Sequence, residues 1–174
     1  MALLDYIKRY TAGRNGTPTV VGIRHQIGLS GETHWIDDVV KWLDKRIKSG
    51  DKVMLEIPEY PLGDLFNSNV FSRVRSYMTQ LCDHLHEKGC EIVPGEDRER
   101  FGTNDEQYHK KHVRDDDFFI PRMRTVRPRF FLVGYAHLDY LREKMPEFEY
   151  VNLVDEKKDN KRCSWLNVDL DKKF

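Results

Sequence analysis

Apolar residues along this chain fall into short runs separated by longer, regularly spaced patterns. The short runs occupy residues 17–22, 52–57, 90–94, 129–134 and 150–154. Runs of this length, bounded by Gly, Pro or charged residues, are typical of strands buried on both faces. A last apolar segment at 165–170 predicts an additional edge strand.

The longer patterns predict helices. Five apolar residues between 34 and 49 follow the i, i+3, i+4, i+7 and i+11 spacing of one helical face. A longer helix is predicted from Leu65 to Lys88, with Gly89 where a C-terminal cap belongs. The polar stretch 104–126 contains a helix whose limits the pattern does not fix, and a short helix stops near Pro146.

This alternation predicts an α/β fold with a mostly parallel central sheet of about five strands and helices on both faces. No repeat and no Pro/Gly/Ser linker interrupts it, so we expect a single α/β domain over residues 1–174. Its core would span about 17–154, followed by a charged C-terminal tail, 155–174. Ligands of such sheets bind beyond the carboxyl ends of the strands, where we therefore expect the chemistry.

Composition narrows the classes of partner. Lys+Arg and Asp+Glu both number 29, so no net charge attracts nucleic acid or a membrane surface. Three cysteines without a Cys-x-x-Cys spacing favour free thiols over a disulfide framework. No signal peptide and no apolar stretch near the ~20 residues of a membrane helix is present. We expect a soluble, cytoplasmic protein without nucleic-acid or membrane partners.

Polar residues follow three of the predicted strands. Two strands end in Gly-x-x-His, at Gly22 to His25 and at Gly134 to His137, and a third ends in Glu56. A buried carboxylate costs several kcal/mol unless it is paired or metal-bound. One such motif is common by chance and is more often structural. The prediction of a site therefore depends on the combination of all three residues.

The trio allows two chemistries. Two neutral imidazoles and a carboxylate, from His25, His137 and Glu56, suit a divalent zinc, manganese or cobalt ion. Such an ion lowers the pKa of bound water to around 7 and polarises a carbonyl group. Without a metal, one histidine could act as base and Glu56 as its orienting partner. The sequence leaves both alternatives open.

The order Gly-x-x-His, Glu, Gly-x-x-His resembles the TraB/Tiki superfamily, which includes erythromycin esterases and ChaN-like haem-binding lipoproteins. Residues 131–138 look like the family's late Gly-x-x-His-Leu segment, and residues 54–56 like its strand-two glutamate. Arg114-Asp115, followed by Phe118, Phe119 and Met123, is similar to its Arg-Asn/Asp segment. The resemblance spans about residues 18–142.

The resemblance implies an EreA/ChaN-like fold with the site at one sheet edge. It implies a metal-dependent peptidase or amide/ester hydrolase for a small-molecule or peptide substrate. His25, Glu56 and His137 would bind the metal, and Arg114 would steady the substrate. The alternatives are a metal-free erythromycin-esterase-like hydrolase and a non-catalytic module that binds haem or a protein.

Further residues are secondary candidates for substrate contact. Glu96 and Asp97 follow the third strand and could add a ligand or an acid–base group, although helix capping or pairing with Arg98 is slightly favoured. Arg24 could hold a substrate carboxylate, and Tyr135 could donate a proton. Alternatively, Arg24 forms a surface salt bridge and Tyr135 packs on the sheet.

Two polar clusters are expected to be structural. His109 and His112 have the i, i+3 spacing that can share a metal on a helix, but they lack an evident carboxylate partner. The acidic run 115–117 is expected to be a solvated turn. No Gly-x-Ser-x-Gly elbow or P-loop occurs in the chain, so serine hydrolysis and nucleotide binding are not indicated.

Overall fold

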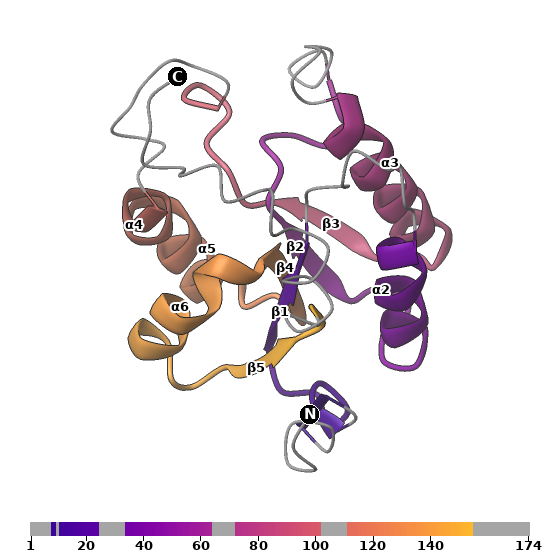
Figure 1. Ribbon diagram of the computed structural model, residues 1–174, viewed down its shortest axis with the longest axis horizontal. Helices are drawn as coiled ribbons and strands as arrows, with labels where there is room; N and C mark the ends of the chain where they lie inside the picture. Colours follow the sequence, from indigo (N-terminus) through magenta and orange to yellow (C-terminus); the bar gives the residue numbers. More distant parts are fainter. Residues whose placement is uncertain (1–7, 10, 25–33, 64–71, 102–110, 155–174) are drawn as a thin grey trace, which may run out of the picture.

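The computed structural model describes residues 8–154 apart from 10, 25–33, 64–71 and 102–110. Its centre is a sheet of five parallel strands in the order β3-β2-β4-β1-β5 (Figure 1). The strands are β1 (Thr19–Ile23), β2 (Lys52–Leu55), β3 (Glu91–Pro94), β4 (Phe130–Gly134) and β5 (Glu149–Asn152). The predicted α/β class and its five-stranded parallel sheet are confirmed, and the predicted strand at 165–170 lies outside the described residues.

Helices cover both faces of the sheet. They are α2 (His34–Asp44), α3 (Ser72–Glu87), α4 (Lys111–Arg114), α5 (Ile120–Val126) and α6 (Leu138–Lys144). A π-helical turn, η2 (Asp115–Phe119), joins α4 to α5, and a 3-10 turn, η3 (Tyr135–His137), precedes α6. Helices α2 and α3 lie on one side of the sheet, and α4, α5 and α6 lie on the other (Figure 1). None of the described helices combines the length and the apolar character that crossing a bilayer requires.

Helix α2 is shorter than the helix predicted for residues 34–49. Helix α2 ends at Asp44 rather than near residue 49. The guanidinium of Arg46 donates to the carbonyl of Trp42, which is the acceptor that the Arg46 N–H would use in a continued helix. The Arg46 N–H bonds to Leu43 instead, which tightens the chain into a turn. The predicted cap of α3 is confirmed, because Gly89 has a φ of 73° just beyond the helix.

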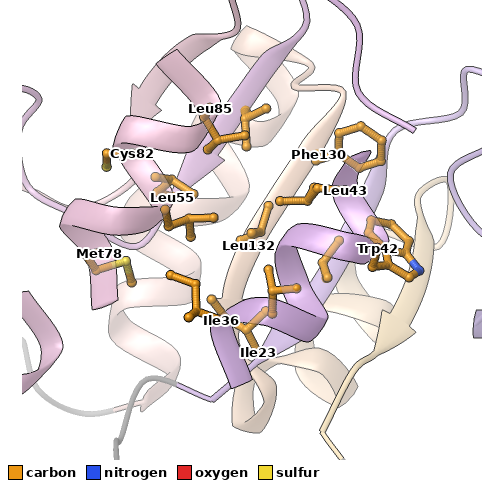
Figure 2. Close-up of a cluster of buried hydrophobic side chains, with 14 of the residues drawn as sticks. Ile23, Ile36, Trp42, Leu43, Leu55, Met78, Cys82, Leu85, Phe130 and Leu132 are labelled. Carbon is orange, nitrogen blue, oxygen red and sulfur yellow. The ribbon is translucent and has the colours of Figure 1, made fainter. Parts of the chain in front are cut away.

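Alternation along the central strands sends successive side chains to opposite faces. Leu55 of β2 and Leu132 of β4 pack under α2 and α3 with Leu43 and Met78 (Figure 2). Met54, the residue directly before Leu55, belongs to the second core cluster, under α5 and α6. By the same alternation Glu56, two residues after Met54, faces the side on which α4 lies.

Strand order sets which strand ends are neighbours. Because β4 lies between β2 and β1, the carboxyl ends of these three strands are contiguous. Leu55 is level with Leu132, and Ile23 is level with Gly134. The residue after β2 and the turn after β4 therefore meet at one point of the sheet edge.

Gly22 permits a close contact within the fold. A Cβ atom there would lie 2.4 Å from Cδ1 of Leu138 and 3.2 Å from the backbone Cα of Tyr135. Turn η3 and the start of α6 thus rest directly on β1. The missing side chain at Gly22 therefore makes room for Leu138. Gly134 has φ −51° and ψ 129°, values that other residues also adopt.

Two cysteines among the described residues are free and buried, as expected. Cys82 and Cys90 face the core under α2 and α3. Burial raises the pKa of the Cys82 thiol to about 12. Neither residue lies beside the polar strand ends, so both act as small core residues.

The close packing at Gly22 gives a stability prediction. Gly22→Ala should lower the free energy of unfolding by about 1–3 kcal/mol, because Leu138 and the backbone of η3 have to move. Urea denaturation measures the change. In a double-mutant cycle with Leu138→Ala, the combined loss should be smaller than the sum, because the smaller side chain relieves the clash. Unchanged stability in Gly22→Ala would contradict the close contact between Gly22 and Leu138.

Candidate functional site

Five polar side chains converge at the carboxyl edge of the sheet. Glu56 follows β2 directly, and Glu96 lies two residues after β3. Arg114 ends α4, Asp115 begins η2, and His137 ends η3. Three strand ends and one helical layer thus supply the cluster, although its members are up to 81 residues apart in the chain.

The guanidinium of Arg114 connects this cluster. Its Nη1 donates to Oε1 of Glu56 at 3.0 Å and to Oε1 of Glu96 at 2.8 Å. Its Nη2 lies 3.1 Å from Nε2 of His137. The Glu96 side chain is completely buried, and that of Glu56 is only 10 % exposed. Because few waters can screen these charges, the hydrogen bonds of Arg114 are stronger than those of a surface pair.

Asp115 orients the imidazole of His137. Oδ1 of Asp115 lies 2.7 Å from Nδ1 of His137, and both side chains are buried. An ionised carboxylate only accepts hydrogen bonds, so Nδ1 carries the proton and Nε2 keeps its lone pair. Nε2 faces Nη2 of Arg114 and lies 3.8 Å from Oε1 of Glu56. Nε2 is thus the ring nitrogen that faces Arg114 and Glu56.

Glu56 is fixed at both carboxylate oxygens. While Oε1 accepts from Arg114, Oε2 accepts from the backbone N–H of Gly134 at 2.8 Å. The second Gly-x-x-His motif is therefore joined to Glu56 through its backbone as well as through its histidine. Two directed hydrogen bonds limit the rotation of the carboxylate and keep Oε1 toward the imidazole.

The Phe119 ring forms an apolar floor beneath the polar groups. Its ring packs edge-on against the imidazole of His137 at 5.5 Å and against Phe131 at 5.2 Å. The guanidinium of Arg114 lies 5.9 Å from the centre of the same ring. The wider π-helical turn places Asp115 and Phe119 on the same side, a feature often found at functional sites. The apolar ring lowers the local dielectric constant and so strengthens the hydrogen bonds beside it.

The structure brings two of the three expected residues together. Oε1 of Glu56 and Nε2 of His137 are 3.8 Å apart, whereas His25 lies outside the described residues. Arg114, suggested by the family resemblance, lies between them. Glu96 also joins the cluster, through a hydrogen bond from Arg114 that the sequence did not predict.

The remaining candidates lie around the cluster. Asp97 accepts a hydrogen bond from the backbone N–H of Arg100 at 2.8 Å, across a turn that follows β3. Arg98 pairs with Glu59 at 2.7 Å. Arg24 directly follows β1 and is half-buried. Tyr135 is 39 % exposed, at the start of η3, where it does not pack into the core.

Asp115 is the residue whose role the sequence did not predict. The acidic run 115–117 was expected to be a solvated turn, and this is wrong for Asp115, which is completely buried. Asp116 and Asp117 are exposed, as expected. Asp116 accepts a hydrogen bond from the Tyr140 hydroxyl, and this bond raises the pKa of Tyr140 to about 12. The sequence did offer one signal that Asp115 is buried: it directly follows Arg114 and lies one helical turn before Phe119.

The donor set also bears on the expected metal. Among residues with described positions, no group of three or more His, Cys, Asp and Glu side chains is placed to hold an ion. Nitrogens of Arg114 lie within 3.1 Å of Glu56, Glu96 and His137. An ion at that point would have to displace a permanent positive charge. A zinc, manganese or cobalt centre therefore stays a prediction.

The chain was compared with protein-family models, with curated proteins and with solved structures, and none of the three comparisons gives a match. The likeness to the TraB/Tiki superfamily therefore depends on the short motifs alone.

Proposed function

We propose that this chain is a hydrolase of amide or ester bonds in which His137 is the general base. The observation that carries the proposal is the buried Asp115–His137 pair, which leaves the lone pair of Nε2 directed at Arg114 and Glu56. A carboxylate, an oriented imidazole and a guanidinium are the groups that water activation and oxyanion stabilisation require. The motif resemblance to hydrolases of the TraB/Tiki type adds support.

The first step is water activation. A water molecule beside Nε2 gives its proton to His137 as its oxygen attacks the carbonyl carbon of the substrate. Asp115 stabilises the resulting imidazolium through Nδ1–H without taking that proton. Oε1 of Glu56, 3.8 Å from Nε2, stabilises the same positive charge. For water to reach Nε2, the contact between Nη2 of Arg114 and Nε2 has to open.

Opening that contact makes Arg114 available to the substrate. Nη1 stays bound to Glu56 and Glu96, so the guanidinium remains at the site while Nη2 turns toward the tetrahedral oxyanion. When the intermediate collapses, the C–N or C–O bond breaks and His137 returns its proton to the leaving group. The imidazole and Arg114 are then restored for the next cycle.

A metal-dependent hydrolase is the second candidate. The observation that favours it is the closeness of Glu56 and His137, two of the three ligands expected from the sequence. The ion would take the place of the Arg114 contacts and would supply a bound water of lowered pKa. The two candidates share Glu56 and His137 and differ in their response to chelators.

The base role of His137 gives an activity prediction. A panel of p-nitrophenyl esters and peptidyl coumarin amides identifies a substrate for the unmodified protein. His137→Gln should then lower kcat by about 10²–10⁴, the usual contribution of a general base. Asp115→Asn should lower kcat because its amide favours the wrong tautomer of His137. His86→Gln, at an exposed position of α3, is the matched control. Full activity of folded His137→Gln would contradict the proposal.

The oxyanion role of Arg114 gives a second activity prediction. Arg114→Met should lower kcat by about 10²–10³ with a smaller change in KM, because the interaction strengthens in the transition state. Arg114→Lys should recover little of the loss, since one ammonium group cannot reach Glu56, Glu96 and the substrate together. Steady-state kinetics on folded variants measures both effects. A change in KM alone would assign Arg114 to substrate binding.

Metal removal separates the two candidates. After dialysis against a chelator, the protein should keep its activity, because Arg114 and His137 supply the charge stabilisation and the base. Metal analysis of the dialysed sample verifies that the ion is gone. The metal-dependent candidate would be favoured if the chelator abolished activity and zinc, manganese or cobalt restored it. The ion should then fail to restore activity in Glu56→Gln.

A further inference from the structure

Asp115 uses only one of its two carboxylate oxygens in the Asp115–His137 pair. Oδ2 is buried and makes no hydrogen bond with any residue whose position is described. Nδ1 of His112 lies 3.6 Å from this oxygen, too far for a hydrogen bond. A buried carboxylate oxygen without a donor is unfavourable by about 1–3 kcal/mol, so this atom calls for an explanation.

His112 is placed to supply the missing donor. It lies on α4 three residues before Asp115, and residues with this spacing share one side of a helix. Its side chain is 55 % exposed, whereas that of Asp115 is completely buried. His112 thus stands between the buried pair and solvent.

Tyr140 holds the His112 ring in this position. The two ring centres are 3.9 Å apart, with 32° between the planes. The Tyr140 hydroxyl donates to Asp116, and the ammonium group of Lys144 lies 5.2 Å from the Tyr140 ring centre. Asp116 thereby fixes the Tyr140 hydroxyl. The support on α6 limits the directions in which His112 can move.

We propose that His112 is a positioning residue whose Nδ1–H donates to Oδ2 of Asp115, so that Oδ1 stays on the Nδ1–H of His137. The three side chains then form one chain, His112–Asp115–His137, with its outer end at the surface. The catalytic part of this inference rests on the proposed function. The hydrogen-bond part stands on the geometry of His112, Asp115 and Tyr140, whatever the function.

Closing the gap takes a small movement. A normal N–H···O bond is about 2.9 Å long, so Nδ1 of His112 has to approach Oδ2 by less than about 1 Å. Hydrogen bonds of catalytic groups are often long without substrate and shorten in the complex. Rotation of an exposed imidazole against Tyr140 provides such a movement without rearranging α4.

The consequence is control of the His137 tautomer. A carboxylate held at both oxygens cannot rotate away from Nδ1 of His137. If the outer donor is lost, Asp115 gains freedom and His137 can carry its proton on Nε2 instead. In that tautomer Nε2 has no lone pair for the water proton, and the base is lost.

Imidazole NMR of the full-length protein tests the inference without a substrate. In ¹⁵N-labelled protein at fixed pH, the Nδ1 and Nε2 shifts report the His137 tautomer, and the Nδ1–H signal reports exchange with water. His112→Phe keeps a ring against Tyr140 and removes the donor. It should speed exchange of the His137 Nδ1–H at least about tenfold, the equivalent of one lost hydrogen bond.

Rescue and control variants separate positioning from mere packing. His112→Gln retains an N–H donor and should restore the native shifts and most of the protection. His86→Phe, the same substitution at an exposed position of α3, should change neither. Native tautomer and exchange in His112→Phe would overturn the inference. Equal loss in His112→Phe and His112→Gln would also overturn it, since then the donor is not what matters.

Kinetics distinguishes this inference from the proposed function. If a substrate is found, His112→Phe should lower kcat at unchanged KM, and His112→Gln should recover most of it. If no substrate is hydrolysed but the NMR effects occur, the proposed function fails and the hydrogen-bond chain stands. If activity depends on His137 while His112→Phe leaves the spectra unchanged, the positioning role fails and the hydrolase proposal stands.

Discussion

The guanidinium of Arg114 is the group on which the polar edge of this protein depends. It contacts the carboxylate after β2, the carboxylate after β3 and the imidazole after β4. The carboxylates of Glu56 and Glu96, both nearly inaccessible to solvent, bind the same nitrogen of Arg114, whose positive charge offsets their mutual repulsion. The ion pairs also attach α4 to the sheet, so the site and the helical layer stabilise each other.

The backbone prepares the position that this charge occupies. With β4 between β2 and β1, the N–H of Gly134 reaches Glu56, and turn η3 settles on Gly22. The imidazole of His137 therefore arrives from a short turn that is packed on one side and hydrogen-bonded on the other. Such support from rigid elements is what keeps an acid–base group in one geometry.

Arg114 and Asp115 are neighbours in the chain but serve opposite sides of His137. Arg114 meets Nε2, where we propose the proton is accepted, and Asp115 meets Nδ1, which sets the tautomer. The π-helical turn that begins at Asp115 also carries Phe119 under both groups. If His112 also bonds to Asp115, the short segment from α4 through η2 supplies every side chain that orients the proposed general base, His137.

The sequence alone determined the α/β class, the parallel strands and the positions of Glu56 and His137 at strand ends. These follow from local periodicity and from polar residues that interrupt apolar runs, which any short window of the chain contains. The tertiary structure decided that Asp115 is buried while Asp116 and Asp117 are exposed, and that Arg114 meets Glu56 across 58 residues. Periodicity cannot specify such contacts, because they depend on strand order and on how one π-helical turn rotates a helix against the sheet.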